Sequence, residues 1–258
     1  MNKIMKLSLT LASAVVLSGC VGGGGGMPNA QQESALGAQQ ERQVLSKVRT
    51  IRSGKLYNAV RNVGSRIARV SGRPDFKWRY HLVNNAKQAN AFVLPGGKVF
   101  VYSGLFKYAA NEAELAAVVG HEVAHALKSH GVKGAQRRQN AGLIGALLQV
   151  GMGVAGVNSG TAQQVNQVYG QGASIGYIKP YSRGNESEAD AIGLMLMAKA
   201  GYDPRAALSF WAKFGRQGQR VPEYLSTHPA PANRIAQIRR LMPQALAVYK
   251  KSRYARRR

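Results

Sequence analysis

Cysteine is nearly absent from this sequence, with one among 258 residues, which excludes an internal disulfide framework and a cysteine-rich zinc module. Any metal site must therefore use histidine and carboxylate side chains, of which the chain has five and 11. Acidic residues are scarce as well, because 36 lysines and arginines give a formal net charge of +25 at pH 7. That excess favours a polyanionic partner, such as nucleic acid, lipopolysaccharide or anionic lipid, or else a soluble basic surface. Composition alone does not choose among them.

Long apolar runs are also few, and neither of the two present is long enough for an ordinary bilayer span. One covers residues 141–157, where 17 positions include five glycines and Gln149. A buried or loosely packed helix, or a mobile flap within residues 141–176, fits this composition better than a membrane helix. The hydrophobic fraction of 45% is that of a globular chain, so a core can form.

The other apolar run, residues 7–17, follows two lysines and has the length of a signal-peptide core. It ends in LSGC at residues 17–20, which resembles the lipobox of bacterial lipoproteins. We therefore predict that residues 1–19 are removed and that Cys20 is acylated; an ordinary signal peptide with an unpaired cysteine is the alternative. Residues 20–35, which contain five consecutive glycines, would form a flexible tether to the folded body.

The predicted anchor places the protein in the bacterial envelope. Valine, not aspartate, follows the cysteine, which by resemblance to enterobacterial lipoproteins favours the outer membrane, facing the periplasm. Nucleic acid is then not expected as a partner. The basic excess, including the tail at residues 246–258, fits contact with anionic envelope lipid or with acidic unfolded proteins.

Periodicity predicts one α+β domain, mostly α-helical, over residues 36–245. Apolar side chains at spacings of three and four predict an amphipathic helix over residues 56–70, and strict alternation predicts a half-buried strand over residues 76–82. Two extended segments, residues 91–94 and 99–102, flank a Pro-Gly-Gly turn and predict a hairpin. The sheet is therefore expected to be small.

Helices are expected to dominate after residue 103. They are predicted near residues 111–130, over residues 185–200, from Asp203-Pro204 onward, and from about Pro231 to just before Pro243. No internal repeat interrupts this pattern, so a single domain is expected.

The sequence HEVAH, from His121 to His125, is the constellation that can carry chemistry. Residues four apart share a helix face, so these two histidines can point ring nitrogens at one ion with Glu122 beside it. Two imidazoles suit tetrahedral zinc and leave a third protein ligand and a water position to be found. Asn111 as N-cap and Glu114 as its capping-box partner support the helix independently. The alternative is a polar helix face without metal.

The third ligand should be a carboxylate or a histidine on another helix, and the best segment is NESEAD at residues 185–190. Glu186 and Asp190 share a helix face there, whereas Glu188 points elsewhere. Glu186 would bind the zinc, and Asp190 could accept the second ring proton of a ligating histidine and fix its orientation. Glu188 is expected to be a solvated helix carboxylate.

HExxH followed by SRxxExxAD, here residues 121–125 and 182–190, resembles the zinc metallopeptidase family that includes HtpX and the prenyl-protein CAAX proteases. NAFVLPGG at residues 90–97 and THP at residues 227–229 match it too, and the resemblance runs over residues 36–241. It implies a gluzincin-like fold, with a small sheet or hairpin beside the HExxH helix and one zinc ion per chain. The lipobox and the lack of clear membrane spans resemble the periplasmic branch, the LoiP-like and BepA-like proteins, here without the BepA repeat domain.

The resemblance implies roles for further residues. His228 would stabilise the oxyanion or act as a resting fourth zinc ligand, although a histidine before proline is by itself more often structural. Arg234 would pair either with acids near the site or in a surface salt bridge. Asn90, Ala91 and Phe92 would form the edge strand to which an extended substrate adds, or a plain hairpin strand.

The function expected from these features is a zinc metalloendopeptidase of the bacterial envelope that hydrolyses unfolded or misassembled proteins. Glu122 would be its general base. The alternative from another class is a polyanion-binding or chaperone-like lipoprotein with a structural zinc. The motif alone also permits a metallohydrolase of non-peptide substrates, which the resemblance disfavours.

Overall fold

The computed structural model describes residues 28–137, 181–215, 223–229, 233–252 and 254. The predicted signal peptide, residues 20–27 of the tether with Cys20, residues 141–157, and residues 253 and 255–258 of the basic tail lie outside the described residues. In the part that is described, no helix is long and apolar enough to cross a bilayer.

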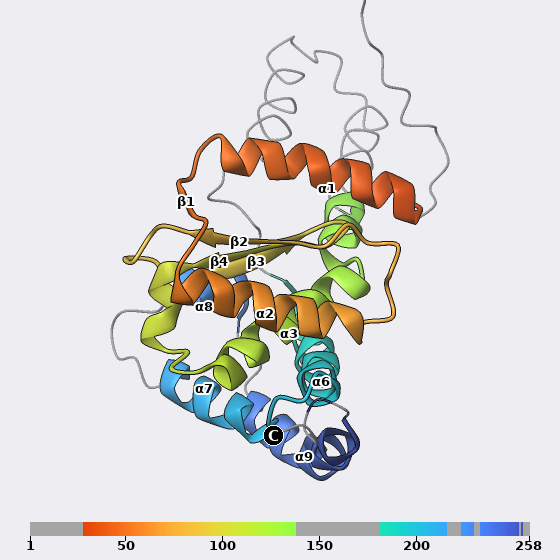
Figure 1. Cartoon of the computed structure of the whole chain (residues 1–258). Helices are drawn as coiled ribbons and strands as arrows, with labels where there is room; N and C mark the ends of the chain where they lie inside the picture. The colour runs from red at the N-terminus through yellow and green to blue at the C-terminus, as the bar shows by residue number, and fades with distance from the viewer. Residues whose placement is uncertain (1–27, 138–180, 216–222, 230–232, 253, 255–258) are drawn as a thin grey trace, which may run out of the picture.

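A four-stranded sheet lies between two layers of helices (Figure 1). Its strands are β1 (Thr50–Ile51), β2 (Arg79–Val83), β3 (Ala91–Leu94) and β4 (Lys98–Tyr102), in the order β1-β2-β4-β3. The two central strands are parallel and both outer pairs are antiparallel. The mostly helical α+β fold with a small sheet confirms the predicted class.

The predicted hairpin is present as β3 and β4, which are joined through Gly96 and Gly97 with φ of 66° and 85°. Such positive φ values are accessible to glycine without strain. The predicted strand over residues 76–82 begins later, at Arg79, because Arg79 pairs with Lys98, the first residue of its partner β4. Residues 76–78 therefore have no strand to pair with.

Alternate side chains of β4 serve two different cores. Val99 and Val101 face the main core against the helices, whereas Phe100 and Tyr102 pack in a second cluster on the opposite face. All five residues of β4 are buried as a result, as expected for a central strand covered on both sides.

One helix, α1 (Ala30–Leu45), covers the second cluster and lies on one side of the sheet in Figure 1. Asn29 and Gln32 form a reciprocal capping box at its start. Residues 30–35, expected in the tether, are therefore helical. A Cβ on Gly37 would lie 1.8 Å from the carbonyl oxygen of Pro95, so α1 approaches the hairpin backbone directly.

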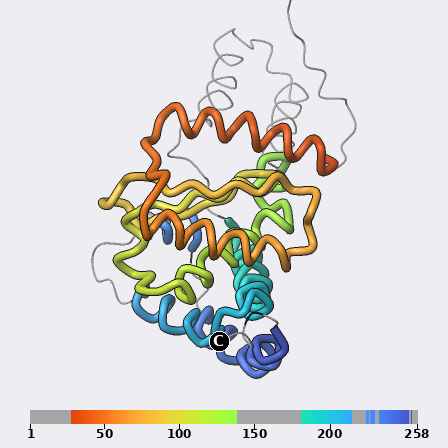
Figure 2. The backbone as a smooth tube through the Cα atoms, viewed as in Figure 1, coloured from red at the N-terminus to blue at the C-terminus, as the bar shows by residue number. Residues whose placement is uncertain are grey.

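The other described helices lie on the opposite side of the sheet. They are α2 (Lys55–Arg69), α3 (Glu112–Leu127), α6 (Arg183–Lys199), α7 (Arg205–Gly215), α8 (Glu223–Thr227) and α9 (Arg234–Lys251), with a 3-10 turn at Ser103–Lys107. All five predicted helices are present with shifted ends, and Gly201, with φ of 75°, follows α6. The backbone tube in Figure 2 shows α1 and α9 at opposite ends of the described part of the chain, with the sheet and α3 between them.

The prediction that the last helix stops before Pro243 is wrong, because α9 continues through this proline to Lys251. Proline removes the hydrogen bond to the carbonyl four residues earlier, on Arg239, which lies on the exposed side. The buried face of α9 continues past the interruption with Ile238, Met242 and Ala245. Packing of that face outweighs the local cost of proline.

Candidate metal centre

The helix α3 carries the HEVAH sequence through the middle of the main core. Asn111 caps it, accepting from the backbone N–H of Glu114 at 2.9 Å. The Glu114 carboxylate accepts from the N–H of Ala110, not of Asn111, and also binds Lys213 at 2.6 Å. The predicted cap is thus present, but the reciprocal half of the capping box reaches one residue further back.

Two glycines bring α6 against α3 at the level of the motif. A Cβ on Gly120 would lie 2.8 Å from the carbonyl oxygen of Gly193, and a Cβ on Gly193 would lie 2.7 Å from the backbone nitrogen of His121. The two backbones can touch only because neither residue has a side chain. This contact between the two helices places Glu186 and Asp190 beside the histidines. No sequence motif predicts the contact.

The structure brings the three predicted zinc ligands together with all their side chains buried. The Nε2 atoms of His121 and His125 are 3.0 Å apart, and the Glu186 carboxylate oxygens lie 3.3 Å from the first and 3.4 Å from the second. Two ligands that each bind tetrahedral zinc at 2.0–2.1 Å lie about 3.3 Å apart. The donor set therefore fits one zinc ion in both chemistry and spacing.

His228 joins this cluster from the segment after α8. Its Nδ1 lies 3.1 Å from Glu186 Oε1 and 3.4 Å from His121 Nε2, and one ligand atom from each of the four residues lies within 4.8 Å of the others. Its ring stacks on Tyr224 at 4.3 Å between centroids. His228 thus lies close enough to the predicted ligands for either of its predicted roles, as a resting fourth zinc ligand or as a group that stabilises the oxyanion.

Asp190 and Arg234 form a second layer behind the ligands. Asp190 Oδ1 lies 2.9 Å from His121 Nδ1, the nitrogen that points away from the cluster. Arg234, 4% exposed, donates to Asp190 Oδ2 at 2.6 Å and to Glu186 Oε2 at 2.8 Å, and it lies over the ring of Trp211. Of its two sequence interpretations, pairing with site acids is the one that the geometry supports.

The charges of the cluster favour a bound cation. Burial alone raises the pKa of Glu186, but hydrogen bonds from three histidines outweigh it and hold this pKa well below its ordinary value. Burial lowers the pKa of His121, yet hydrogen bonds to Asp190 and Glu186 prevail and raise it to about 9. The cluster therefore attracts positive charge, which a proton or a metal ion can supply.

Glu122 has one occupied and one unoccupied carboxylate oxygen. Oε1 accepts from the hydroxyl of Tyr224 at 2.8 Å, and burial raises the pKa of Glu122. Oε2 is buried without a hydrogen-bond partner, as is Nε2 of His228, which lies 3.4 Å from Oε1. Buried polar groups without partners are uncommon in folded proteins and point to function. Sequence reasoning missed Tyr224, which lies in no motif.

The predicted substrate strand, β3, is an edge strand of the described sheet, paired with β4 alone. Asn90 accepts at Oδ1 from the N–H of Ala91, and Ala91 faces the main core. Phe92 points to the opposite face and stacks on Phe100 at 4.8 Å under α1. The strand can therefore offer an extended peptide its backbone, but not the Phe92 side chain.

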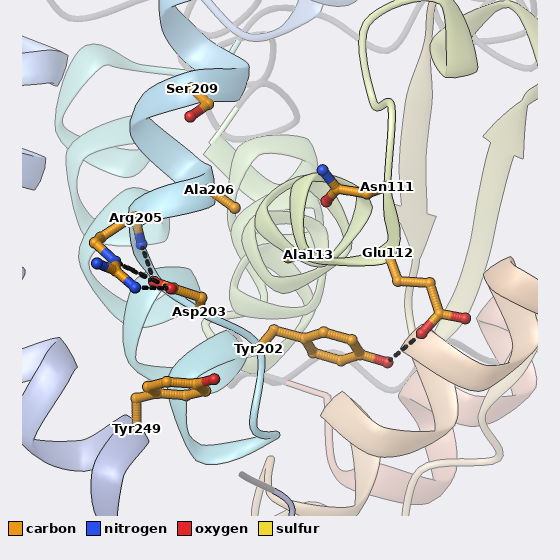
Figure 3. Close-up of a pocket in the computed structure, with 9 residues that line it drawn as sticks. All are labelled: Asn111, Glu112, Ala113, Tyr202, Asp203, Arg205, Ala206, Ser209 and Tyr249. Atoms are coloured by element: carbon orange, nitrogen blue, oxygen red, sulfur yellow. Dashed lines mark hydrogen bonds and ion pairs between the residues drawn. The ribbon is translucent and has the colours of Figure 1, made fainter. Parts of the chain in front are cut away.

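Glu188 lies away from the four-residue cluster, as expected. Its side chain is 43% exposed and pairs with Lys128 at 2.6 Å. A pocket of about 500 Å³ lies elsewhere, at the N-terminal end of α3 (Figure 3), and its charged side chains pair locally, Asp203 with Arg205 and Tyr202 with Glu112. It contains none of the predicted site residues.

Comparison with known proteins agrees with this geometry. The model of peptidase family M48 matches residues 55–242. The chain is 36% identical over 190 residues to the mitochondrial metalloendopeptidase OMA1 of Schizosaccharomyces pombe, covering 72% of this chain and 53% of that protein. It is 34% identical over 223 residues to the beta-barrel assembly-enhancing protease of Yersinia pestis, covering 81% of this chain and 43% of that protein. The chain thus spans about half the length of the curated relatives it matches.

Proposed function

The chain belongs to peptidase family M48, and we propose that it is a zinc-dependent endopeptidase of the bacterial envelope. The observation that carries this proposal is the unpartnered Oε2 of Glu122 beside four converging ligand atoms. A carboxylate held in this way is poised to take a proton from a water molecule.

His121, His125 and Glu186 would hold the zinc ion, with His228 as a candidate fourth ligand. When bound, zinc supplies a Lewis acid that polarises a carbonyl and lowers the pKa of water. Asp190 fixes the His121 ring by accepting from Nδ1, so that Nε2 keeps its lone pair toward the cluster. Arg234 pairs with the carboxylates of Glu186 and Asp190 at the same time and holds both in place.

Glu122 would act through its two oxygens separately. Tyr224 holds Oε1, which fixes the plane of the carboxylate, and Oε2 takes the proton from water. The raised pKa that burial gives Glu122 makes its carboxylate a stronger base toward water, and the acid formed can then donate the proton to the more basic leaving amine. One side chain thus serves as base and then as acid.

The two ring nitrogens of His228 allow its two predicted roles. Nδ1 lies among the ligand atoms, where it would complete a resting coordination shell. Nε2 has no hydrogen-bond partner and lies 3.4 Å from Glu122 Oε1, where its N–H would donate to the oxyanion of the tetrahedral intermediate. A change from the first role to the second would accompany substrate binding.

An extended substrate would pair with the edge of β3 that is unpaired in the described sheet, near Asn90, Ala91 and Phe92. Backbone hydrogen bonds along an edge strand give affinity with little sequence preference, which suits unfolded protein substrates. A plain hairpin strand remains the alternative for this element.

The envelope location and the substrates are proposals that rest on the sequence and on the relatives. The lipobox-like segment ending at Cys20 supports an outer-membrane lipoprotein that faces the periplasm. The Yersinia pestis relative is named for beta-barrel assembly, which supports unfolded or misassembled envelope proteins as substrates here. Six of the 11 acidic side chains are buried, so the exposed charge is more one-sided than the composition and favours contact with anionic lipid.

Incubation of the full chain with a chemically unfolded protein tests the proposal. Cleavage is expected to stop with a zinc chelator and to return when zinc is added back. The rival function, a polyanion-binding or chaperone-like lipoprotein with structural zinc, predicts a zinc-loaded protein that cleaves no unfolded substrate. The rival gives no reason for the buried, unpartnered Oε2 of Glu122.

A further inference from the structure

His130 occupies a special position directly after the metal-binding helix. α3 ends at Leu127, and Ser129 turns the chain with φ of 50°, the single positive φ outside glycine among the described residues. A left-handed conformation is unfavourable for serine. The Ser129 hydroxyl donates to Glu33 on α1 at 2.5 Å. This turn brings His130 back against His125.

The His130 ring is buried and joined to two groups. Its Nδ1 lies 2.9 Å from Nδ1 of His125, and its Nε2 lies 3.0 Å from Oε2 of Glu188. Glu188 is in turn paired through Oε1 with Lys128 at 2.6 Å. His130 itself is 3% exposed. Its ring nitrogens have no other hydrogen-bond partner in the described parts of the chain.

The positions of the protons follow from the metal site. His125 presents Nε2 to the ligand cluster, so its lone pair must be there and its proton on Nδ1. That Nδ1–H can donate only to an unprotonated Nδ1 of His130. The remaining proton of a neutral His130 ring is then on Nε2, where Glu188 accepts it. Each assignment forces the next.

We propose that His130 is a positioning residue for zinc binding, which with Glu188 orients His125 as Asp190 orients His121. The proposal rests on the proposed zinc site. Ligating histidines generally donate their second N–H to a fixed acceptor, and loss of that acceptor typically costs about 10–100-fold in metal affinity. His121 has a carboxylate in this position, whereas His125 has a histidine backed by a carboxylate. Tyr181 packs on the His125 ring at 3.9 Å between centroids.

Two substitutions at His130 separate orientation from packing. Asparagine carries its Oδ1 where histidine carries Nδ1, so His130→Asn keeps the acceptor for His125. His130→Leu fills a similar volume without an acceptor. Zinc affinity of the full chain is measured by competition with a chromogenic chelator. We expect about a 10–100-fold loss for His130→Leu and near wild-type affinity for His130→Asn.

Equal affinity in His130→Leu and wild type would overturn the proposal, and so would an equal loss in both variants, which indicates packing alone. If His130→Leu does not fold, the exposed Glu188→Leu replaces it, and a loss of zinc affinity of less than about 10-fold is expected. Unchanged affinity there would overturn the proposal. Thermal unfolding with excess chelator checks the fold independently of zinc. A wild-type chain that binds no zinc overturns the proposed function as well.

Discussion

Two regions of the described structure each gather several buried charged side chains, and the side chains of the two regions are satisfied to different degrees. Under α1, Glu33 and Glu41 each use both carboxylate oxygens, and Lys98 donates to the carbonyl of Gly96. At the metal centre, Glu122 and His228 each keep a buried polar atom without a partner. Buried polar groups that are fully paired serve the fold, whereas unpaired ones cost free energy and need another reason to exist.

The polar partners under α1 fit the small size of the core there. This cluster holds five buried hydrophobic residues, four on the outer face of the sheet and one on α1, far fewer than the main core. Glu41 adds a contact to His81 at 2.7 Å and to Arg79 at 3.5 Å, which joins the helix to β2. In the metal centre the same kinds of side chain converge on one point, because each supplies an atom to a shared ligand.

The substitution Glu122→Gln is expected to have the largest effect. Glutamine keeps the shape and can still accept from Tyr224, but its amide cannot take a proton from water. Cleavage of an unfolded protein is expected to fall about 10²–10⁴-fold, with zinc content unchanged. The matched control is Glu114→Gln on the same helix, a buried carboxylate whose partners are all within the fold, and it should still cleave. Full chelator-sensitive cleavage by Glu122→Gln would remove the general-base assignment.

The second prediction distinguishes two carboxylates one half-turn apart on α6. Glu186→Ala removes a group that contacts three histidines, so the purified chain is expected to lose its zinc. Glu188→Ala should retain one zinc per chain, because Glu188 acts at most through His130. Elemental analysis after dialysis measures both variants. Zinc lost from Glu188→Ala and kept by Glu186→Ala would reverse the ligand assignment.

The sequence predicts the metal centre better than its surroundings, for a physical reason. His121, Glu122 and His125 are linked by helix geometry, and Glu186 and Asp190 by the same rule on another helix, so local spacing suffices. Which two helices touch depends on contacts between distant backbones that leave no periodic pattern. The Gly120 and Gly193 contact belongs to this class.

Residues that join the site from distant parts of the chain were missed for the same reason, because such contacts leave no periodic pattern in the sequence. Tyr224 and His130 are single side chains outside any motif, and Arg234 could be placed either at the site or on the surface. The helix α1 was not predicted. One reason is that its buried face carries Glu33 and Glu41, which a search for a hydrophobic pattern does not detect. The error at Pro243 has another origin, because a local rule was overridden by the packing of α9.

The third prediction tests the claim that charges under α1 serve the fold alone. Glu41→Ala removes the partner of His81 and Arg79, and the free energy of unfolding is expected to fall by about 1–3 kcal/mol. Zinc content and cleavage should stay at wild-type values, since Glu41 touches no ligand. Denaturant unfolding and zinc analysis of the same preparation measure both. A variant of normal stability with impaired cleavage would contradict the division between the two regions.

The smallest effect is expected from a methyl group. Gly37→Ala places a Cβ against the carbonyl oxygen of Pro95, so α1 must shift away from the hairpin. The matched control, Gly184→Ala on α6, meets nothing closer than Ser182 Oγ at 3.9 Å. Alanine is the better helix former by about 0.5–1 kcal/mol, so Gly184→Ala should raise the free energy of unfolding by up to that amount.

The same gain applies to Gly37, but overpacking of about 1–3 kcal/mol opposes it, and a net loss of about 1–2 kcal/mol is expected. Opposite signs from one chemical change would show that close backbone contact, not helix propensity, fixes α1 on the sheet. Stabilisation by both substitutions would mean that α1 is free to move off the hairpin. The paired carboxylates of α1, Glu33 and Glu41, would then contribute little to the stability of the fold. The two regions would still differ in how their charges are paired, but that difference would not appear in the free energy of unfolding.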